Sequence, residues 1–347
     1  MKIGVVFGGR SNEHEISIMS AASIVSAIDR KKYEPVCFVI DKKGDWYHTE
    51  IDLSELFELT DPRISEITVN ARKVNIAEFD EMTDFVFPVL HGPYGEDGTI
   101  QGLLEMLGKP YAGQGVTASA ISMDKILTKY VWTTAGLSVS EYTSTTGHAC
   151  ASGLLDEAKR IESQIPYPVF VKPANMGSSV GISKANDLSG LETAIKTALK
   201  YDKRVIVEQA VFGKELEIGI IGNEDPAASA IGEIMPGHEY YDYDSKYRGE
   251  GTKISIPADI PEEIKLEIEA LAVSAYKVLD GEGFARVDMF YDEKQKKIYL
   301  NEMNAIPGFT KYSMFPLLWQ AKGVEYGELI ERIIALGYER HNAKNCR

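Results

Sequence analysis

The amino-acid sequence predicts a mixed α/β fold in two or three domains, and three observations lead to this prediction. The chain has 347 residues, which exceeds the roughly 150 residues of one ordinary domain. Its 44% hydrophobic and 26% charged content is that of a globular protein with a buried core. Residues 3–40 run through strand, glycine turn, helix and strand, which is how a parallel sheet begins.

The N-terminal unit is predicted to continue this parallel sheet, and two further units follow it. A second unit begins near Thr117, and the pattern changes again at Phe212 and Gly213. The polar segment 238–254, rich in Tyr, Asp and Gly, predicts a mobile loop. The predicted strands are 3–7, 33–40, 85–90, 169–172, 204–208, 217–221, 229–235, 284–291 and 297–303, and the predicted helices are 13–28, 99–107, 119–135, 187–200, 261–279 and 325–338.

Charge and cysteine content exclude several classes of protein. A net charge of -15 argues against a general nucleic-acid binder, which would carry a basic face, although a nucleotide ligand remains compatible. Cys37, Cys150 and Cys346 are scattered and form no CxxC pair, as expected for reduced thiols without a structural zinc. No apolar run approaches the ~20 residues of a membrane span. We therefore expect a cytoplasmic protein without a membrane or nucleic-acid partner.

The densest group of chemical side chains lies on the last predicted strand pair. Arg286 and Asp288 alternate on one strand, and Glu302 and Asn304 alternate on the other, so each pair faces one side. If the strands pair, two carboxylates and an amide oxygen converge, and hard oxygen ligands of this kind suit Mg²⁺. A solvated ladder of charged residues on a two-stranded ribbon explains the same pattern, and this group alone does not decide between the two.

Two glycine turns could also bind anions. Residues 172–181 read KPANMGSSVG, a strand-ending lysine and then a glycine-serine loop whose N–H groups can face phosphate, without the order of a P-loop. Residues 8–17 read GGRSNEHEIS, a glycine turn into a helix N-terminus. Glu13 and Glu15 there also fit as ordinary first-turn acids. His14 and His91 have no partner at zinc-ligand spacing.

Taken together, the chain resembles the D-alanine–D-alanine ligase family of the ATP-grasp superfamily. The resemblance covers nearly the whole chain in order and rests on HGPYGEDGTIQG (residues 91–102), KPANMGSSVG, DYDSKY (242–247), ARVDMF (285–290) and NEMNAIPGFTKYS (301–313). It implies an ATP-grasp fold with a Rossmann-like N-terminal domain over 1–116, a central ATP-binding subdomain over 117–212, and a C-terminal subdomain over 213–347. A homodimer formed through the N-terminal domain is expected.

The resemblance also implies roles for individual residues. Lys125, Lys172 and Lys246 would bind phosphates of ATP, with the loop residues Gly177, Ser178 and Ser179, and Glu208, Gln209, Val211 and Glu215 would line the adenosine pocket. Asp288, Glu302 and Asn304 would hold two Mg²⁺ ions, or Mn²⁺. Glu13 would bind the ammonium group of the first D-alanine, with Ser178 and Tyr247 completing a hydrogen-bonded set. Arg286 and Gly308 would stabilise the oxyanion, and His91, Asn304, Ser313 and Met314 would line the amino-acid sites.

The implied reaction joins two D-alanines through an acyl phosphate, which a closing loop would protect from water. D-lactate and D-serine are alternative second substrates. Tyr247 and Met314 match the D-alanine pattern, whereas the family has histidine or arginine there for the alternatives. A non-catalytic nucleotide-binding relative is a further alternative, against which the intact Lys172 and Arg286 argue. Met303, Ala305 and Gln209 depart from the usual family residues, and Ala305 removes a hydroxyl beside the predicted metal site.

Overall fold

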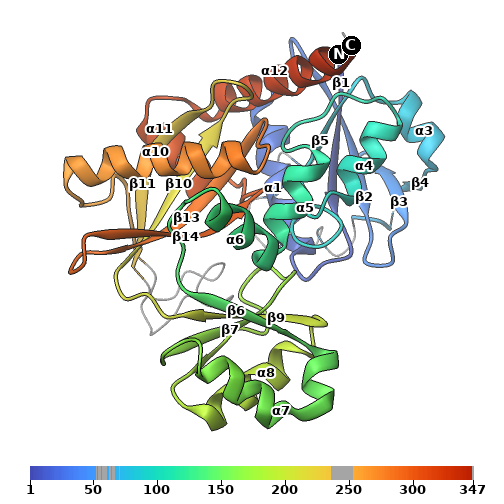
Figure 1. Ribbon diagram of the computed structural model, residues 1–347. Coiled ribbons are helices and arrows are strands. Elements are labelled where there is room, and N and C mark those ends of the chain that lie inside the picture. Colours follow the sequence, from blue (N-terminus) through green and yellow to red (C-terminus); the bar gives the residue numbers. More distant parts are fainter. Residues whose placement is uncertain are drawn as a thin grey trace.

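The computed structural model describes residues 1–51, 53, 56, 61, 64, 67–69, 71–235 and 253–345. Its strands form three sheets, and helices pack against them in layers, so the predicted mixed α/β fold is confirmed (Figure 1). Both termini lie close together at the top of Figure 1, and the four-stranded sheet lies at the opposite end.

The first sheet has a parallel centre, as predicted. Strand β1 pairs in parallel with β2 on one side and β5 on the other, while β3 and β4 add an antiparallel edge that the pattern did not predict. β1 is buried from Ile3 to Gly8, as expected for a strand covered on both faces. The elements of this unit are β1 (Lys2–Gly8), α1 (His14–Ala27), β2 (Glu34–Ile40), β3 (Trp46–Thr49), β4 (Arg72–Lys73), α3 (Ile76–Glu81), β5 (Phe85–Pro88) and α4 (Thr99–Met106).

The four-stranded sheet is antiparallel, in the order β6-β9-β7-β8, with α7 and α8 on its outer face (Figure 1). Along β7, Val169 and Val171 are buried in the core with α7 and α8. Lys172 therefore points to the opposite face, away from these helices. The elements are β6 (Tyr142–Thr146), α7 (Gly147–Glu162), β7 (Val169–Pro173), β8 (Ser183–Ala185), α8 (Leu188–Ala198) and β9 (Arg204–Gln209).

The third sheet is also antiparallel, in the order β12-β11-β10-β13-β14. Helix α10 contacts one face, and α11 contacts β10 and β11. Trp319 and Leu329, from α11 and α12, share a core with Ile18 and Phe87 of the first unit, which ties the C-terminal helices to the N-terminal sheet. The elements are β10 (Lys214–Ile221), β11 (Ala227–Met235), β12 (Lys253–Ser255), α10 (Glu262–Val278), β13 (Phe284–Asp292), β14 (Lys297–Asn304), α11 (Met314–Ala321) and α12 (Tyr326–Asn345).

Two predictions from the pattern were wrong in detail. The single helix expected over 119–135 is two helices, α5 (Val116–Met123) and α6 (Lys125–Thr134). Asp124 between them has extended backbone, and its carboxylate accepts the N–H groups of Ile126 and Leu127, so it caps α6. The loop expected over 238–254 ends in β12 at Lys253, and the rest of it lies outside the described residues.

The described helices include none that is both long and apolar enough to cross a membrane.

Candidate active site

Two adjoining cavities lie where the three units meet. The larger, of about 840 Å³, has walls from β7 and β9 on one side and from β10, β11, β13 and β14 on the other. The smaller, of about 170 Å³, is bounded by residues of the first unit and by the segment after β14. Both are lined by Lys125, Met176, Gly177, Ser178, Ile234 and Glu302. Of the predicted site residues that the structure describes, all except Asp288 line one or both of these cavities.

Lysine–carboxylate pairs characterise the larger cavity. Nζ of Lys172 lies 3.0 Å from Oε2 of Glu208, and Nζ of Lys125 lies 3.4 Å from Oε2 of Glu302. Nζ of Lys125 also donates to the carbonyl oxygen of Met176 at 2.8 Å. Both lysines thus stand at the cavity wall, where the sequence predicted phosphate contacts. Gln209, Val211, Glu215 and Ser179 line the same cavity.

The glycine-serine loop lies against Glu13. A Cβ added to Gly177 would stand 3.3 Å from Oε2 of Glu13, and one added to Gly92 would stand 3.1 Å from the same oxygen. Ser178 and Ser179 have φ values of 50° and 59°, a left-handed backbone that is uncommon for non-glycine residues and concentrates at functional sites. Glu13 thus lies beside the glycine-serine loop, and Glu13 and Ser178 both line the smaller cavity.

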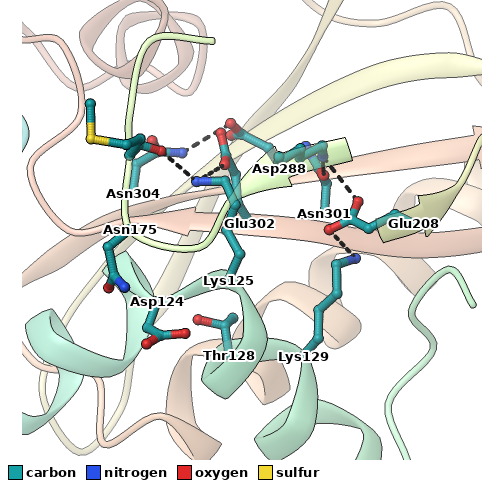
Figure 2. A network of polar contacts seen from close by, with 12 residues as sticks. Asp124, Lys125, Thr128, Lys129, Asn175, Glu208, Asp288, Asn301, Glu302 and Asn304 are labelled. Carbon is teal, nitrogen blue, oxygen red and sulfur yellow. Dashed lines mark hydrogen bonds and ion pairs between the residues drawn. The ribbon is translucent and has the colours of Figure 1, made fainter. Parts of the chain in front are cut away.

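The predicted metal ligands meet across β13 and β14. Asp288 pairs directly with Glu302, and Arg286 pairs with Asn304. Nδ2 of Asn304 donates to Oδ2 of Asp288 at 2.9 Å (Figure 2). No group of three or more His, Cys, Asp or Glu side chains in the described part of the chain could hold a metal by itself. Two carboxylates and an amide oxygen fit Mg²⁺, which takes its other ligands from phosphates and water.

Arg286 is held between two buried carboxylates. Its Nε and Nη2 each donate to Asp288 at 2.7 Å, and Nε lies 3.0 Å from Oε2 of Glu217. Although burial by itself lowers the pKa of Arg286, Asp288 and Glu217 outweigh it and raise the pKa well above its ordinary value. Arg286 is therefore a fixed cation in the wall of the smaller cavity, suited to a developing negative charge.

His91 joins the first unit to the segment after β14. Its Nδ1 donates to the carbonyl oxygen of Ile306 at 3.0 Å, so the neutral ring accepts at Nε2 from the Ser20 hydroxyl, also at 3.0 Å. Burial lowers the pKa of His91, which favours this neutral form. Both ring nitrogens are thus occupied, and His91 shapes the smaller cavity rather than offering a free hydrogen bond to a ligand.

The carboxyl group of Glu96 also joins the first unit to the segment after β14. It accepts from the N–H of Gly92 at 2.7 Å and from the N–H of Ile306 at 3.0 Å. Desolvation, then the charge of Glu13, raises the pKa of Glu96 to about 8. The pattern singled out the motif that contains Glu96 but gave this residue no role.

The remaining amino-acid-site residues follow β14. Gly308, Ser313 and Met314 line the smaller cavity together with Ala305. The Ser313 hydroxyl is engaged with Thr310, accepting its N–H at 3.1 Å. Met303 is buried in the core of the third unit, and it also contributes to the lining of the smaller cavity. Lys246 and Tyr247 lie outside the described residues, so their roles stay predictions.

Sequence reasoning missed further residues of the site. Glu217 faces Asp288 across β10 and β13, and its alternation with Glu215 in a strand was the only available signal. Asn301 and its neighbour Glu302 both line the larger cavity, although consecutive residues of a regular strand face opposite sides. Lys129 lies one helical turn after Lys125 on α6 and is buried beside Glu208.

Comparisons with known proteins identify the family. Residues 2–114 match the family model of the D-alanine–D-alanine ligase N-terminus, and residues 131–335 match that of the C-terminus. The chain is 46% identical to "D-alanine--D-alanine ligase" of Geobacillus thermodenitrificans, covering 99% of this chain and 97% of that one. It is 44% identical to the protein of the same name from Chloroherpeton thalassium, covering 100% and 98%.

Solved structures agree with these sequence matches. The D-alanine–D-alanine ligase of Coxiella burnetii superposes with a TM-score of 0.86 at 34% identity, covering 99% of this chain and 96% of that one. The VanG D-Ala:D-Ser ligase of Enterococcus faecalis gives the same TM-score at 33% identity, covering 97% and 99%. These structures have the ATP-grasp fold, which this chain shares. With both halves of the family model matched and the predicted residues gathered around two cavities, the chain belongs to the D-alanine–D-alanine ligase family.

Proposed function

We propose that this protein joins two D-alanines to D-alanyl-D-alanine with ATP, giving ADP and phosphate. The observation that carries this function is the pair of adjoining cavities that share Lys125, Ser178 and Glu302. The larger, with Lys172 and Lys125, suits a nucleotide. The smaller, with Glu13 and Arg286, suits an amino acid, whose ammonium and carboxylate are complementary to these charges.

In the first step the carboxylate oxygen of one D-alanine attacks the γ-phosphorus of ATP. An O–P bond forms while the bond from phosphorus to the bridging oxygen breaks, so ADP leaves and a D-alanyl phosphate remains. Glu13 binds the ammonium group of this D-alanine, and Lys125 and Lys172 bind phosphate oxygens. Lys246, which lies outside the described residues, would reach the γ-phosphate.

In the second step the neutral amine of the other D-alanine attacks the acyl carbon. The C–N bond forms, phosphate departs with the electron pair of the C–O bond, and the nitrogen releases a proton to solvent. Arg286 and the N–H of Gly308 stabilise the negative oxygen of the tetrahedral intermediate. Ser313 and Met314 orient the second substrate. Tyr247 would link to Ser178 over the site.

Asp288, Glu302 and Asn304 would hold two Mg²⁺ ions, which neutralise charge on the phosphate oxygens when bound. Glu208, Gln209, Val211 and Glu215 would contact the adenosine. We further propose that the three sheets mark the three domains 1–116, 117–212 and 213–347, although α5 and α6 contact the third sheet and α10. The protein would act as a homodimer in the cytoplasm, where ATP is available, and would supply a peptidoglycan precursor.

The direct test is phosphate release from ATP and D-alanine, with the dipeptide identified by mass. Parallel reactions with D-alanine plus D-serine or D-lactate test the alternatives. Met314, with 7% of its surface exposed, places an apolar side chain at the smaller cavity and favours a methyl group over a hydroxymethyl group. Absence of ATP-dependent dipeptide, or a mixed product that predominates over D-alanyl-D-alanine, would contradict the proposal.

A further inference from the structure

Lys129 is a buried lysine that the reaction described above does not use. It lies on α6, with 1% of its surface exposed, and lines neither cavity of the site. Its Nζ lies 3.6 Å from Oε1 of Glu208 and within hydrogen-bonding distance of the Ser140 hydroxyl (3.2 Å) and the carbonyl oxygen of Leu300 (3.4 Å). Burying an ammonium group costs several kcal/mol unless such partners compensate, so its retention here calls for an explanation.

The partner of Lys129 stands in the wall of the nucleotide cavity. Glu208 presents Oε1 to Lys129, as Figure 2 shows, and Oε2 to Lys172, so each oxygen of its carboxylate lies beside a different lysine. Lys172 and Glu208 line the larger cavity, and Lys129 supports them from behind. Burial by itself would raise the pKa of Glu208, but the charges of Lys129 and Lys172 outweigh it and leave the pKa below its ordinary value.

A β-bulge fixes the other side of Lys172. Asp288 pairs with Glu302 while Met289 pairs with Leu300, so Asn301 is an extra residue on β14. Such a bulge re-aims side chains beside a site, and here Asn301 and Glu302 both line the larger cavity. Oδ1 of Asn301 accepts from Nζ of Lys172 at 3.4 Å. Lys129, Glu208, Lys172 and Asn301 therefore form a connected network, in which Lys129 and Glu208 are buried and Lys172 and Asn301 are partly buried.

The surroundings of Glu208 indicate what it contacts. Phe170, Ile182, Val211 and Met235 line the same cavity and offer apolar surface to a flat ring. Lys125, Gly177 and Ser178 line both cavities and so lie toward the smaller one. An ionised carboxylate only accepts hydrogen bonds. A purine with an exocyclic amino group can donate a hydrogen bond to the Glu208 carboxylate. A purine with a carbonyl at that position cannot, because the carbonyl oxygen and the carboxylate are both acceptors and repel each other.

We propose that Lys129 is a positioning residue for nucleotide recognition, which acts through Glu208 to favour an amino purine over an oxo purine. The inference rests on the proposed function, because it concerns the base of the nucleotide that the ligase consumes. Lys129 touches no substrate, and its effect is to keep the Glu208 carboxylate ionised and immobile at the cavity wall. The mechanism therefore predicts that Lys129 matters only while Glu208 is present.

The experiment compares Lys129→Met, Glu208→Gln and the double variant by calorimetric titration with ADP and with GDP. Lys129→Met is expected to weaken ADP binding about tenfold, the equivalent of one lost charge-assisted contact of about 1.4 kcal/mol. Binding of GDP should change less. The double variant should bind ADP no more weakly than Glu208→Gln alone, within about twofold, because coupled residues are not additive. In turnover assays the KM for ATP should rise more than kcat falls.

Lys109→Met is the matched control. Lys109 is also a largely buried lysine, which donates to the carbonyl oxygens of Asp80 and Thr83 in the first unit. The Lys109→Met variant should have a lower melting temperature and an unchanged affinity for ADP. If Lys129→Met does not fold, the double variant takes its place, because it also removes the charge of the Glu208 carboxylate. The double variant is then compared with Glu208→Gln.

Additive losses in the double variant, or equal weakening of ADP and GDP, would overturn the inference. Unchanged ADP affinity in folded Lys129→Met would overturn it as well. Equilibrium binding requires no turnover, so a protein that binds ADP selectively but forms no dipeptide would contradict the proposed function and leave the role of Lys129 standing.

Discussion

Carboxylates outnumber cations in both cavities of the site, but the cavities differ in how these carboxylates are compensated. In the larger cavity each lysine in the wall has a carboxylate partner, as in the pairs Lys172–Glu208 and Lys214–Glu233. Its carboxylates are Glu208, Glu215, Glu233, Glu293 and Glu302, and its cations are Lys125, Lys172 and Lys214. In the smaller cavity one carboxyl group is compensated by a proton, because desolvation and then the charge of Glu13 raise the pKa of Glu96 to about 8. The carboxylates of the smaller cavity are Glu13, Glu96, Glu217 and Glu302, and its cations are Lys125 and Arg286.

This difference suits each cavity to the ligand that we propose for it. An amino acid brings an ammonium group, which offsets the negative excess of the smaller cavity. A nucleotide would bring several negative charges into a larger cavity whose carboxylates already outnumber its lysines, so it would need metal ions as additional counter-charges. Glu302 belongs to both cavities, and we expect substitutions there to disturb both ligands. The predictions below test this contrast, from the largest expected effect to the smallest.

The largest effect should follow loss of a metal ligand. Asp288→Asn and Glu302→Gln each remove a carboxylate charge at similar size, and we expect turnover to fall by at least about a thousandfold, because the phosphoryl charge is no longer neutralised. Excess EDTA should abolish wild-type turnover in the same assay of phosphate release.

The control for these variants is Asp292→Asn on the same strand. Asp292 is also buried, but its carboxylate accepts the N–H groups of Lys294 and Gln295 at the turn after β13. Asp292→Asn should lower the free energy of unfolding by about 1 kcal/mol and leave turnover nearly unchanged. Near-normal activity of Glu302→Gln in Mg²⁺ would show that the metal assignment is wrong.

A smaller effect is expected for Arg286→Lys, which retains the charge but loses the planar fork that reaches Asp288 through two donors. We expect kcat to fall by about a hundredfold to a thousandfold, the range for one lost oxyanion donor. Thermal unfolding measures the accompanying loss of stability. A variant that loses stability but keeps kcat would assign Arg286 to structure alone.

Glu13→Gln should act on the smaller cavity only. Removing the carboxylate that offsets the substrate ammonium should raise the KM for the first D-alanine by about tenfold or more, as for a hydrogen bond to a charged group of about 1.5–3 kcal/mol. The KM for ATP should stay constant. Glu15→Gln is the control on the same helix, since Glu15 forms an exposed pair with Lys42. An increase confined to the KM for ATP would contradict the assignment of the first D-alanine to the smaller cavity.

The smallest effect concerns the pH dependence of stability. The pKa of Glu96 is about 8 in the folded protein and near 4.5 in the unfolded chain. Between these values the folded state binds a proton that the unfolded chain has released, so this group makes stability fall as pH rises from about 5 to 8. In chemical denaturation across this range, the free energy of unfolding should fall less steeply with pH for Glu96→Gln than for wild type. Identical slopes would show that Glu96 is ionised at neutral pH.

Much of the site was predictable because its residues alternate on strands or occupy glycine loops in short motifs. Asp288 and Glu302 were expected to face one another, and the register of β13 and β14 pairs them directly. Glu217 could not be assigned in this way, because its contact with Arg286 depends on the register between β10 and β13. The break at Asp124 was missed because apolar periodicity continues through it, while the cap depends on the local backbone.

By itself, the sequence determined the α/β class, the parallel start of the first sheet and the residue types that can bind phosphate, metal and ammonium. Periodicity and side-chain chemistry are local properties, so they can be read without coordinates. Only the tertiary structure decided that Lys129 lies behind Glu208, that a bulge turns Asn301 to the cavity, and that α12 packs on the first unit. Burial and charge balance arise from segments far apart in the chain, and packing alone sets the distances between them.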